Sequence, residues 1–386
     1  MNIIYVILIF IFGFLITYGI KSKLSRRDQR ILNILWLYHI FTSIAYYYYI
    51  ISNGGDAYSY WNGAKRMTSS DFLNNISGVN ALGNKFMIAI NYIPAHLMGM
   101  NFFANTLFFG LLGFIAFTFL YRICIQTIPY NSKFYKFRLF PLLLFLPNLH
   151  FWSSGVGKDT LSFLSILMVA YGFMRISKRF PLVVIGLLLS LGIRPHITLM
   201  LIMSFGFAYL INGKISLPQR IGLFILMFTA AILILPSVLN FVNMDSLSIA
   251  DLGQFSNTKA GGLSVGSGSG LDLSSYPYPL KVLTFLYRPF FFDINGIPAV
   301  VASFENLLLL LLSIRVIRNR FFATFKAAPL VIQGLFLFFI MGALVFSMSM
   351  SNLGIILRER NMFLPGLILF ILWSFSSLNG RRKIFK

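Results

Sequence analysis

Residues 213–242 read GKISLPQR followed by IGLFILMFTAAILILPSVLNFV, a short basic link and then 22 residues without a charged side chain. An α-helix rises about 1.5 Å per residue, so about 20 apolar residues cross the hydrocarbon core of a bilayer. Residues 221–242 are therefore predicted to span a membrane, and the link before them to lie at one membrane surface.

The rest of the chain repeats this pattern of apolar runs and short polar links. Hydrophobic residues make up 58% of the 386 residues and charged residues 11%, whereas a typical soluble protein has about 25% charged residues. The composition predicts an all-α, polytopic membrane protein with residues 1–386 in a single transmembrane domain. We expect 11 spans, at roughly 3–20, 31–51, 101–121, 139–153, 160–175, 180–194, 196–212, 221–242, 297–314, 328–350 and 363–379.

The charges are sorted between the links. Of the 32 Lys and Arg residues, 22 fall in six links, at 21–30, 122–138, 175–179, 213–220, 315–326 and 381–386. Only one of the 10 acidic residues, Asp28, shares these links. Because Lys and Arg concentrate on the cytoplasmic face, the N-terminus is predicted to lie outside and the C-terminus inside. The net charge of +22 is then explained by the orientation of the spans, with a secondary contribution from contacts with anionic lipid headgroups. No nucleic-acid partner is expected.

Cysteine and histidine usage argues against several kinds of site. The single cysteine, Cys124, cannot form an intrachain disulfide, and the four histidines form no HExxH motif or paired metal spacing. No cofactor is therefore expected, and a divalent metal has no support. The first apolar run lacks a basic stretch before it and a small-residue cleavage site after it, so we expect a retained span rather than a signal peptide.

Two larger loops are predicted on the outer side, at 52–101 and 243–296. The first contains a moderately apolar stretch, 86–100, that could lie in the membrane interface as an amphipathic helix. The second contains the Gly/Ser-rich run 261–270, whose composition predicts a mobile lid or binding loop.

The first outer loop begins with Asn53-Gly54-Gly55-Asp56-Ala57-Tyr58-Ser59-Tyr60-Trp61. Asp56 is thereby placed at the outer membrane boundary, flanked by aromatic rings that could stack on a sugar. A carboxylate at this position could take a proton from a bound hydroxyl, and Asp56 is the candidate base. The alternative is a turn residue beside the ordinary aromatic belt.

Two short hairpins are expected, 139–175 and 180–212, with outer turns at 153–159 and 194–196. Runs of about 15 residues barely cross a bilayer, so either the membrane thins there or the turns lie in a protein-lined cavity.

The first of these turns contains Gly157-Lys158-Asp159. A Walker A loop is excluded, because its first glycine would fall on Trp152 and Asp159 replaces the Ser or Thr that meets magnesium. A helix N-terminus with Lys158 can hold an anion; alternatively, Asp159 caps the next helix and Lys158 reaches toward the interface.

The second turn is Arg194-Pro195-His196. An Arg on the outer side has no topological reason to be there, and its guanidinium suits phosphate or pyrophosphate. His196 is a candidate proton carrier near neutral pH. The alternative for Arg194 is an interfacial contact with a lipid phosphate.

Further charged residues are predicted on the same outer side. Glu305 lies inside a span, where an acid is a functional candidate by default; the alternative is a structural hydrogen bond, with Ser303 and Asn306 as partners. Arg288 could bind an anion or pair with Asp293. The run Arg358-Glu359-Arg360 could hold a lipid pyrophosphate or form a surface salt-bridge run.

Several of these segments resemble GT-C glycosyltransferases, polytopic enzymes that use polyprenyl-linked sugars. The chain is similar above all to the O-antigen polymerase (Wzy) group in size, span number and abundance of Phe, Ile and Tyr. The likeness rests on short motifs: Gly55-Asp56-Ala57 with Tyr60, the segment 147–159, Tyr287-Arg288-Pro289-Phe290, and Asn352-Leu353-Gly354 before Arg358 and Arg360. Many members have paired acids in the first loop, whereas Asp56 stands alone, so metal dependence is not carried over.

This resemblance implies a bacterial inner-membrane glycosyltransferase that acts at the periplasmic face on a polyprenyl-pyrophosphate-linked oligosaccharide, polymerising O-antigen repeat units. Asp56, His196 and Glu305 are the catalytic candidates, and Lys158, Asp159, Arg194, Arg288, Arg358 and Arg360 the pyrophosphate-binding candidates. Membrane lipids and a chain-length regulator protein are the other expected partners. The alternatives are a GT-C enzyme that adds one sugar to a lipid or protein, and a flippase for lipid-linked glycans.

Overall fold

The computed structural model describes residues 2–19, 24–77, 81–213, 215–242, 270–271, 273 and 276–384, with side chains described as far as 377 apart from Val242. The structure is 81% helical. The sheet of this described part is one hairpin, in which β1 (Lys133–Phe134) pairs antiparallel with β2 (Phe137–Arg138). The predicted all-α class is therefore confirmed.

The chain forms two compact units that alternate along the sequence. Unit 1 comprises Met1–Ile123 and Leu149–Thr198, and unit 2 comprises Cys124–Asn148 and Leu199–Lys386. Three helices run across the boundaries in sequence: α6 (Phe102–Thr127), α8 (Pro147–Trp152) and α11 (Pro195–Asn212). A single transmembrane domain over the whole chain stays a prediction.

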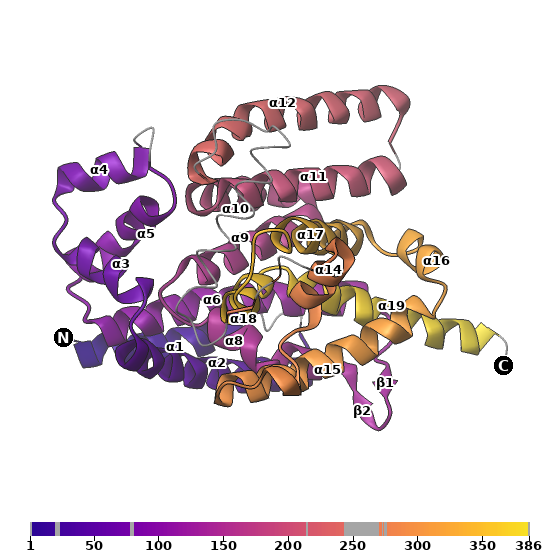
Figure 1. Cartoon of the computed structure of the whole chain (residues 1–386), viewed down its shortest axis with the longest axis horizontal. Coiled ribbons are helices and arrows are strands. Elements are labelled where there is room, and N and C mark those ends of the chain that lie inside the picture. The colour runs from indigo at the N-terminus through magenta and orange to yellow at the C-terminus, as the bar shows by residue number, and fades with distance from the viewer. Residues whose placement is uncertain are drawn as a thin grey trace. The chain divides into compact units, whose positions relative to one another are not determined.

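Unit 1 is built from long apolar helices and a group of shorter ones (Figure 1). Ser25 begins α2 with a capping box, because its hydroxyl accepts from the Asp28 amide at 3.1 Å while the Asp28 carboxylate accepts from the Ser25 amide at 3.2 Å. Besides α6 and α8, its helices are α1 (Asn2–Gly19), α2 (Arg26–Asn53), α3 (Asp56–Lys65), α4 (Ser69–Ser77), α5 (Asn84–Asn91), the π-helix η2 (Tyr92–Leu97), α9 (Lys158–Phe173) and α10 (Ile176–Ile193).

Unit 2 contains the C-terminal helices and the β-hairpin (Figure 1). The helix α17 packs along α19, where the rings of Phe336 and Phe370 are 4.1 Å apart. Besides α11, the elements of unit 2 are α7 (Leu139–Leu142), η3 (Leu143–Phe145), α12 (Leu217–Val242), α14 (Tyr278–Tyr287), η4 (Phe291–Asp293), α15 (Ile297–Ile317), α16 (Phe321–Lys326), α17 (Leu330–Phe346), α18 (Leu353–Arg360) and α19 (Leu364–Ile384).

Seven helices in the described part are long and apolar enough to cross a membrane: α1, α2, α6, α10, α11, α12 and α15. Two shorter apolar helices lie at Leu330–Phe346 and Leu364–Ser377. Each of these nine coincides with a predicted span, and the chain is a polytopic membrane protein. The count of 11 spans and the orientation of the termini stay predictions.

One predicted span, 139–153, is wrong as a single helix. The structure divides it into α7, η3 and α8, with non-helical backbone at Phe140 (φ −98°, ψ 129°) and at Leu146 (ψ 122°). Both residues precede a proline, Pro141 or Pro147, and the proline ring disfavours the helical conformation of the residue before it. The apolar composition was read correctly, but the prolines interrupt the helix.

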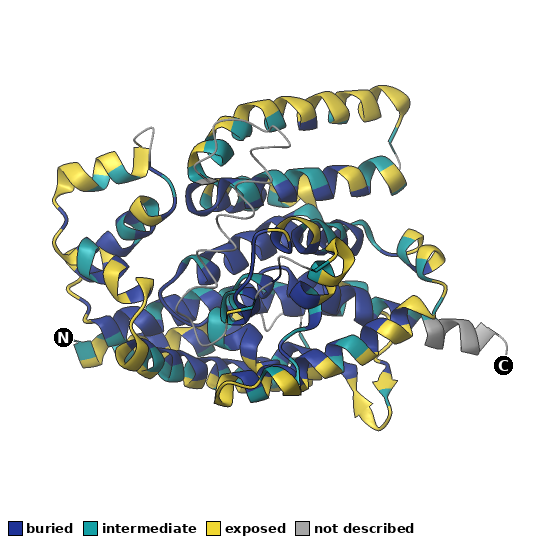
Figure 2. Cartoon of the chain, in the orientation of Figure 1, coloured by how far each residue is buried: buried dark blue, intermediate teal, exposed yellow. Residues whose placement is uncertain are grey.

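Among the seven long apolar helices, α12 is the most exposed (Figure 2). Only 6% of its most apolar segment is buried by protein. Phe224, Leu226 and Leu233 are 58%, 64% and 72% exposed. A helix that is apolar around its whole circumference is covered by lipid or by other protein. The pattern agrees with the membrane span predicted from residues 221–242.

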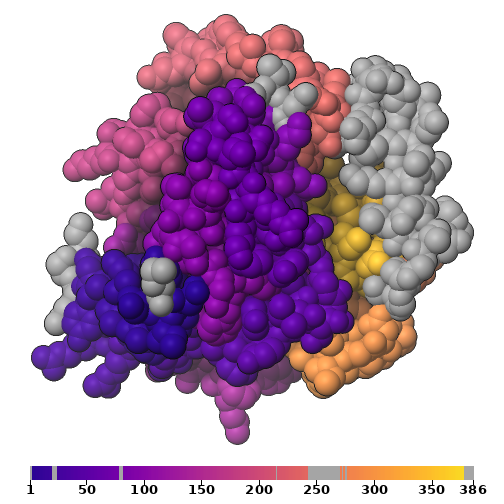
Figure 3. All heavy atoms as spheres, turned by 90° about the vertical axis from the view of Figure 1, so that its left-hand side faces the viewer, coloured from indigo at the N-terminus to yellow at the C-terminus, as the bar shows by residue number. Residues whose placement is uncertain are grey.

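The predicted outer loop 52–101 is largely helical, with α3, α4, α5 and η2 forming one continuous surface (purple in Figure 3). The helix expected within 86–100 is present as part of α5 and as η2, which exposes Ile93 and Leu97. In the second outer loop, α14 and η4 are formed, whereas the Gly/Ser-rich run falls outside the described residues except for Gly270.

Candidate functional site

The turn 153–157 of unit 1 is fixed by close approach to two neighbouring helices. A Cβ atom at Gly113 of α6 would lie 1.9 Å from the Ser153 carbonyl oxygen, so only glycine allows this approach. From α2, the Tyr46 hydroxyl donates to the Val156 carbonyl at 3.1 Å. The turn therefore has a defined position at the start of α9.

A buried ion pair joins this turn to the predicted turn at 194–196. Arg194 Nη2 lies 2.9 Å from Asp159 Oδ1, and the two residues are 5% and 7% exposed. Asp159 is in the first turn of α9, where the helix dipole favours a negative charge, and Arg194 ends α10. The N-cap of α9 is Gly157, so Asp159 pairs with Arg194 and is not the capping residue.

Lys158 and His196 lie beside this pair in sequence, as the first residue of α9 and the second of α11, and both are half-buried. The structure thus brings the two predicted turns together through Asp159 and Arg194. Two buried charges that satisfy each other form a costly but stable arrangement, and removal of either one leaves the other uncompensated.

Asp56 takes a different position in unit 1. It is the exposed first residue of α3, after Gly54 and Gly55, whose φ angles of 72° and 134° favour glycine. Within the described part of the chain it makes no hydrogen bond or ion pair. Tyr58, two residues farther along α3, is 45% exposed, and its ring lies 5.4 Å from that of Trp61. The predicted base is therefore accessible, next to an exposed aromatic ring.

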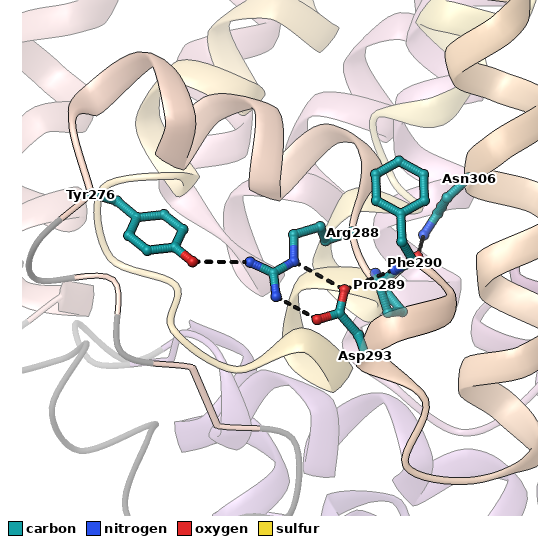
Figure 4. Close-up of polar contacts among 6 residues, drawn as sticks. All are labelled: Tyr276, Arg288, Pro289, Phe290, Asp293 and Asn306. Atoms are coloured by element: carbon teal, nitrogen blue, oxygen red, sulfur yellow. Dashed lines mark hydrogen bonds and ion pairs between the residues drawn. The ribbon is translucent and has the colours of Figure 1, made fainter.

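Unit 2 holds a second Arg–carboxylate pair, between Arg288 and Asp293 (Figure 4). One edge of the guanidinium meets both carboxylate oxygens, because Nε donates to Oδ2 at 3.0 Å and Nη2 donates to Oδ1. The Tyr276 hydroxyl lies 3.4 Å from Nη1. The Phe290 amide also donates to Asp293, at 2.8 Å. The hydrogen bonds that Arg288 donates to Asp293 raise the pKa of Arg288 above its ordinary value despite partial burial.

Arg360 supports the loop that carries this pair. It is 2% exposed, and Nη1 donates to the Leu286 carbonyl at 2.6 Å while Nη2 donates to Asn306 Oδ1 at 2.5 Å. Asn306 in turn donates to the Pro289 carbonyl at 2.7 Å (Figure 4). Burial lowers the pKa of Arg360 to about 10, against the opposing effect of Glu305, so the side chain is charged at neutral pH. Its Nη1 and Nη2 groups donate to protein acceptors, whereas its buried Nε has no hydrogen-bond partner among the described residues.

Glu305 is held by a partner that the sequence did not suggest. The Asn148 amide donates to Oε1 at 2.9 Å, and the Asn148 side chain donates to Oε2 at 2.6 Å. Asn361 donates to the Asn148 carbonyl at 2.7 Å. The expected partners are used elsewhere, because Asn306 bonds to Arg360 and Ser303 donates to the Ala299 carbonyl. This geometry favours the structural role for Glu305.

The run 358–360 is divided by the helix α18. Arg360 is buried, whereas Arg358 and Glu359 are half-buried. Consecutive helical residues point in directions about 100° apart, so Arg358 and Arg360 do not present one joint cluster. Arg288 is a predicted cation of unit 2 whose guanidinium meets a carboxylate directly.

A buried histidine pair in unit 1 was not foreseen. His39 of α2 and His150 of α8 place their Nδ1 atoms 2.8 Å apart, both fully buried, and Phe117 stacks on His150 with ring centroids 4.0 Å apart. The pair is 111 residues apart in sequence, so no local spacing signals it. The described residues contain no group of three or more His, Cys, Asp or Glu arranged to hold a metal ion.

Comparison with models of protein families, with curated proteins and with solved structures finds no match for this chain.

Proposed function

We propose that the protein is a membrane glycosyltransferase that uses a polyprenyl-pyrophosphate-linked oligosaccharide, with polymerisation of surface-polysaccharide repeat units as its reaction. A bacterial inner membrane is the proposed location. The observation that carries the proposal is the Arg288–Asp293 pair between α14 and α15. It is a preformed guanidinium site in a polytopic membrane protein, with side-chain exposures of 14% and 6%.

The chemistry follows from what a guanidinium recognises. Arg binds carboxylate and phosphate with the same two-pronged geometry, so a pyrophosphate oxygen can replace Asp293 on Arg288. Arg288 would then stabilise the charge that develops on the leaving pyrophosphate. The bond between the sugar anomeric carbon and the pyrophosphate breaks, and a bond from that carbon to the acceptor oxygen forms.

The proton of the acceptor hydroxyl needs a base. The sequence assigns this role to Asp56, which is exposed and unpaired among the described residues. The pair in unit 2 offers a second candidate, because an anion that displaces Asp293 from Arg288 releases its carboxylate to accept the proton. Asp56→Asn and Asp293→Asn, tested separately, distinguish the two assignments.

Arg360 and Asn306 are proposed to position Arg288. They anchor the carbonyls of Leu286 and Pro289 on either side of it. Arg194 and Lys158 of unit 1 keep their predicted role as anion-binding residues, and His196 its role as a proton carrier. Arg358 keeps its predicted role of binding the pyrophosphate, whereas Glu305 is proposed to hold Asn148 in place.

The test is a deletion strain of the source bacterium, with surface polysaccharide resolved on a gel and the deletion complemented with variants. Loss of a polymerase leaves a single repeat unit on its acceptor, whereas loss of a flippase leaves none. An unchanged ladder would rule out the polymerase. Arg288→Ala should lose the ladder, whereas Arg318→Ala, an exposed residue at the other end of α15, should keep it at equal protein level.

A further inference from the structure

A separate group of basic side chains surrounds Tyr171 near the end of α9. The guanidinium carbon of Arg179 lies 3.8 Å from the Tyr171 ring centroid, and that of Arg122 lies 5.6 Å from the same centroid. Phe119 stacks on this ring, with centroids 5.2 Å apart. Arg122 and Phe119 belong to α6 and Arg179 to the first turn of α10, so three helices of unit 1 meet at one tyrosine.

The two guanidinium groups have no carboxylate partner within the described ranges. Arg179 Nη1 donates to the Tyr171 carbonyl at 2.9 Å, which places a positive charge at the C-terminal end of α9. Arg122 Nη1 approaches the Tyr171 hydroxyl at 3.5 Å. A guanidinium carries five N–H donors, so most of the donors of this pair have no acceptor in the described chain. Two like charges that contact the same tyrosine without a counter-ion repel each other.

The surroundings of the pair indicate what kind of anion fits. Ile176 and Phe180, next to Arg179 on α10, are 39% and 59% exposed. Farther along the same helix, Leu188 is 61% exposed. An exposed apolar helix face beside unpaired guanidinium groups suits a molecule with a phosphate at one end and acyl chains at the other.

We propose that Arg122, Arg179 and Tyr171 form a binding site for the phosphate of an anionic membrane lipid. Arg122 and Arg179 bind the phosphate oxygens, and the acyl chains lie along the exposed apolar face of α10. Both arginines belong to the basic links predicted to face the cytoplasm, where anionic lipids attract positive charge. The site is independent of the proposed glycosyl transfer, because it shares no residue with the Arg288 and Arg194 pairs.

The test uses the purified full-length protein in lipid nanodiscs, with the thermal unfolding midpoint as readout. Nanodiscs of phosphatidylcholine are compared with nanodiscs in which phosphatidylglycerol replaces part of that lipid. The wild-type midpoint should rise with phosphatidylglycerol, and Arg122→Gln/Arg179→Gln should lose that rise. The matched control is Lys133→Gln/Lys136→Gln, which removes two charges from the exposed β-hairpin and should keep the rise.

The comparison of the two lipids within each variant makes the result independent of any general loss of stability. The variant Arg122→Lys/Arg179→Lys keeps both charges but loses the planar fork, so half-saturation should require about tenfold more phosphatidylglycerol. A double Gln variant that retains the full lipid-dependent rise would overturn the proposal. The proposal would also be overturned if inorganic phosphate at equal ionic strength, and not phosphatidylglycerol, raised the unfolding midpoint of the wild type.

Discussion

Replacement of Arg360 by methionine tests most sharply whether Arg360 holds the loop 286–293, which contains Arg288, in place. Arg360 is 2% exposed, and its guanidinium bonds to the Leu286 carbonyl and to Asn306. Methionine keeps most of the side-chain length and apolar contact but removes the charge and every donor. The variant leaves buried acceptors without a partner and Glu305 without its nearby positive charge.

The expected cost follows from these contacts. Removal of one partner from a buried charged network destabilises a protein by about 3–5 kcal/mol. A unit of this size loses a few degrees of unfolding midpoint per kcal/mol, so the midpoint should fall by roughly 10 °C. Because the Arg288 loop loses its anchors at Leu286 and Asn306, the segment 286–293 should also become more accessible to protease.

The assay is thermal unfolding of the purified protein in one detergent, combined with limited proteolysis. Arg318→Met is the matched control, because Arg318 is an exposed residue at the end of α15, and surface substitutions change stability by about 0.5 kcal/mol or less. An Arg360→Met protein with the midpoint and protease resistance of Arg318→Met would refute the assigned role of Arg360.

Two further predictions concern unit 1. Gly113→Ala should strongly destabilise the protein, because its Cβ would lie 1.9 Å from the Ser153 carbonyl oxygen. The control is Gly222→Ala, whose Cβ would have nothing within 4 Å and which should leave the unfolding midpoint unchanged. Equal midpoints for the two variants would contradict the close approach of Gly113 to Ser153. Hydrogen bonds from Thr68 lower the pKa of Asp71, so its ionised form stabilises the start of α4 above the ordinary carboxyl pKa, and this contribution is lost as the pH falls through the folded-state pKa. Amide exchange in α4 should therefore be faster in Asp71→Asn than in wild type at pH 7, and the two should converge at low pH; a difference that persists there would contradict the assignment.

Much of the membrane architecture could be predicted from the sequence, because apolar length and charge sorting are local properties. The spans at 221–242 and 297–314 coincide with α12 and α15 for this reason. The span at 139–153 was mispredicted because the prediction rested on its apolar composition and did not take into account that Pro141 and Pro147 interrupt a helix. The helices of the loop 52–101 were only partly foreseen, since α3 and α4 are short and carry many polar residues.

The candidate site was predictable as a set of residue types but not as a set of contacts. Arg288 and Asp293 are five residues apart, so their pairing could be proposed from sequence. Asn148 and Glu305 are 157 residues apart, and an asparagine is too common to signal a distant carboxylate. The same applies to His39 and His150, whose contact exists only because α2 and α8 pack together in unit 1.

The central claim is that Arg288 binds the pyrophosphate of a lipid-linked donor. Its most direct test is native mass spectrometry of the purified protein with a polyprenyl pyrophosphate, comparing wild type, Arg288→Ala and the control Arg318→Ala. We expect wild type and the control to bind alike and Arg288→Ala to bind about tenfold or more weakly, because a charged hydrogen-bond pair contributes roughly 1.5–3 kcal/mol. Equal binding by all three proteins would contradict the claim.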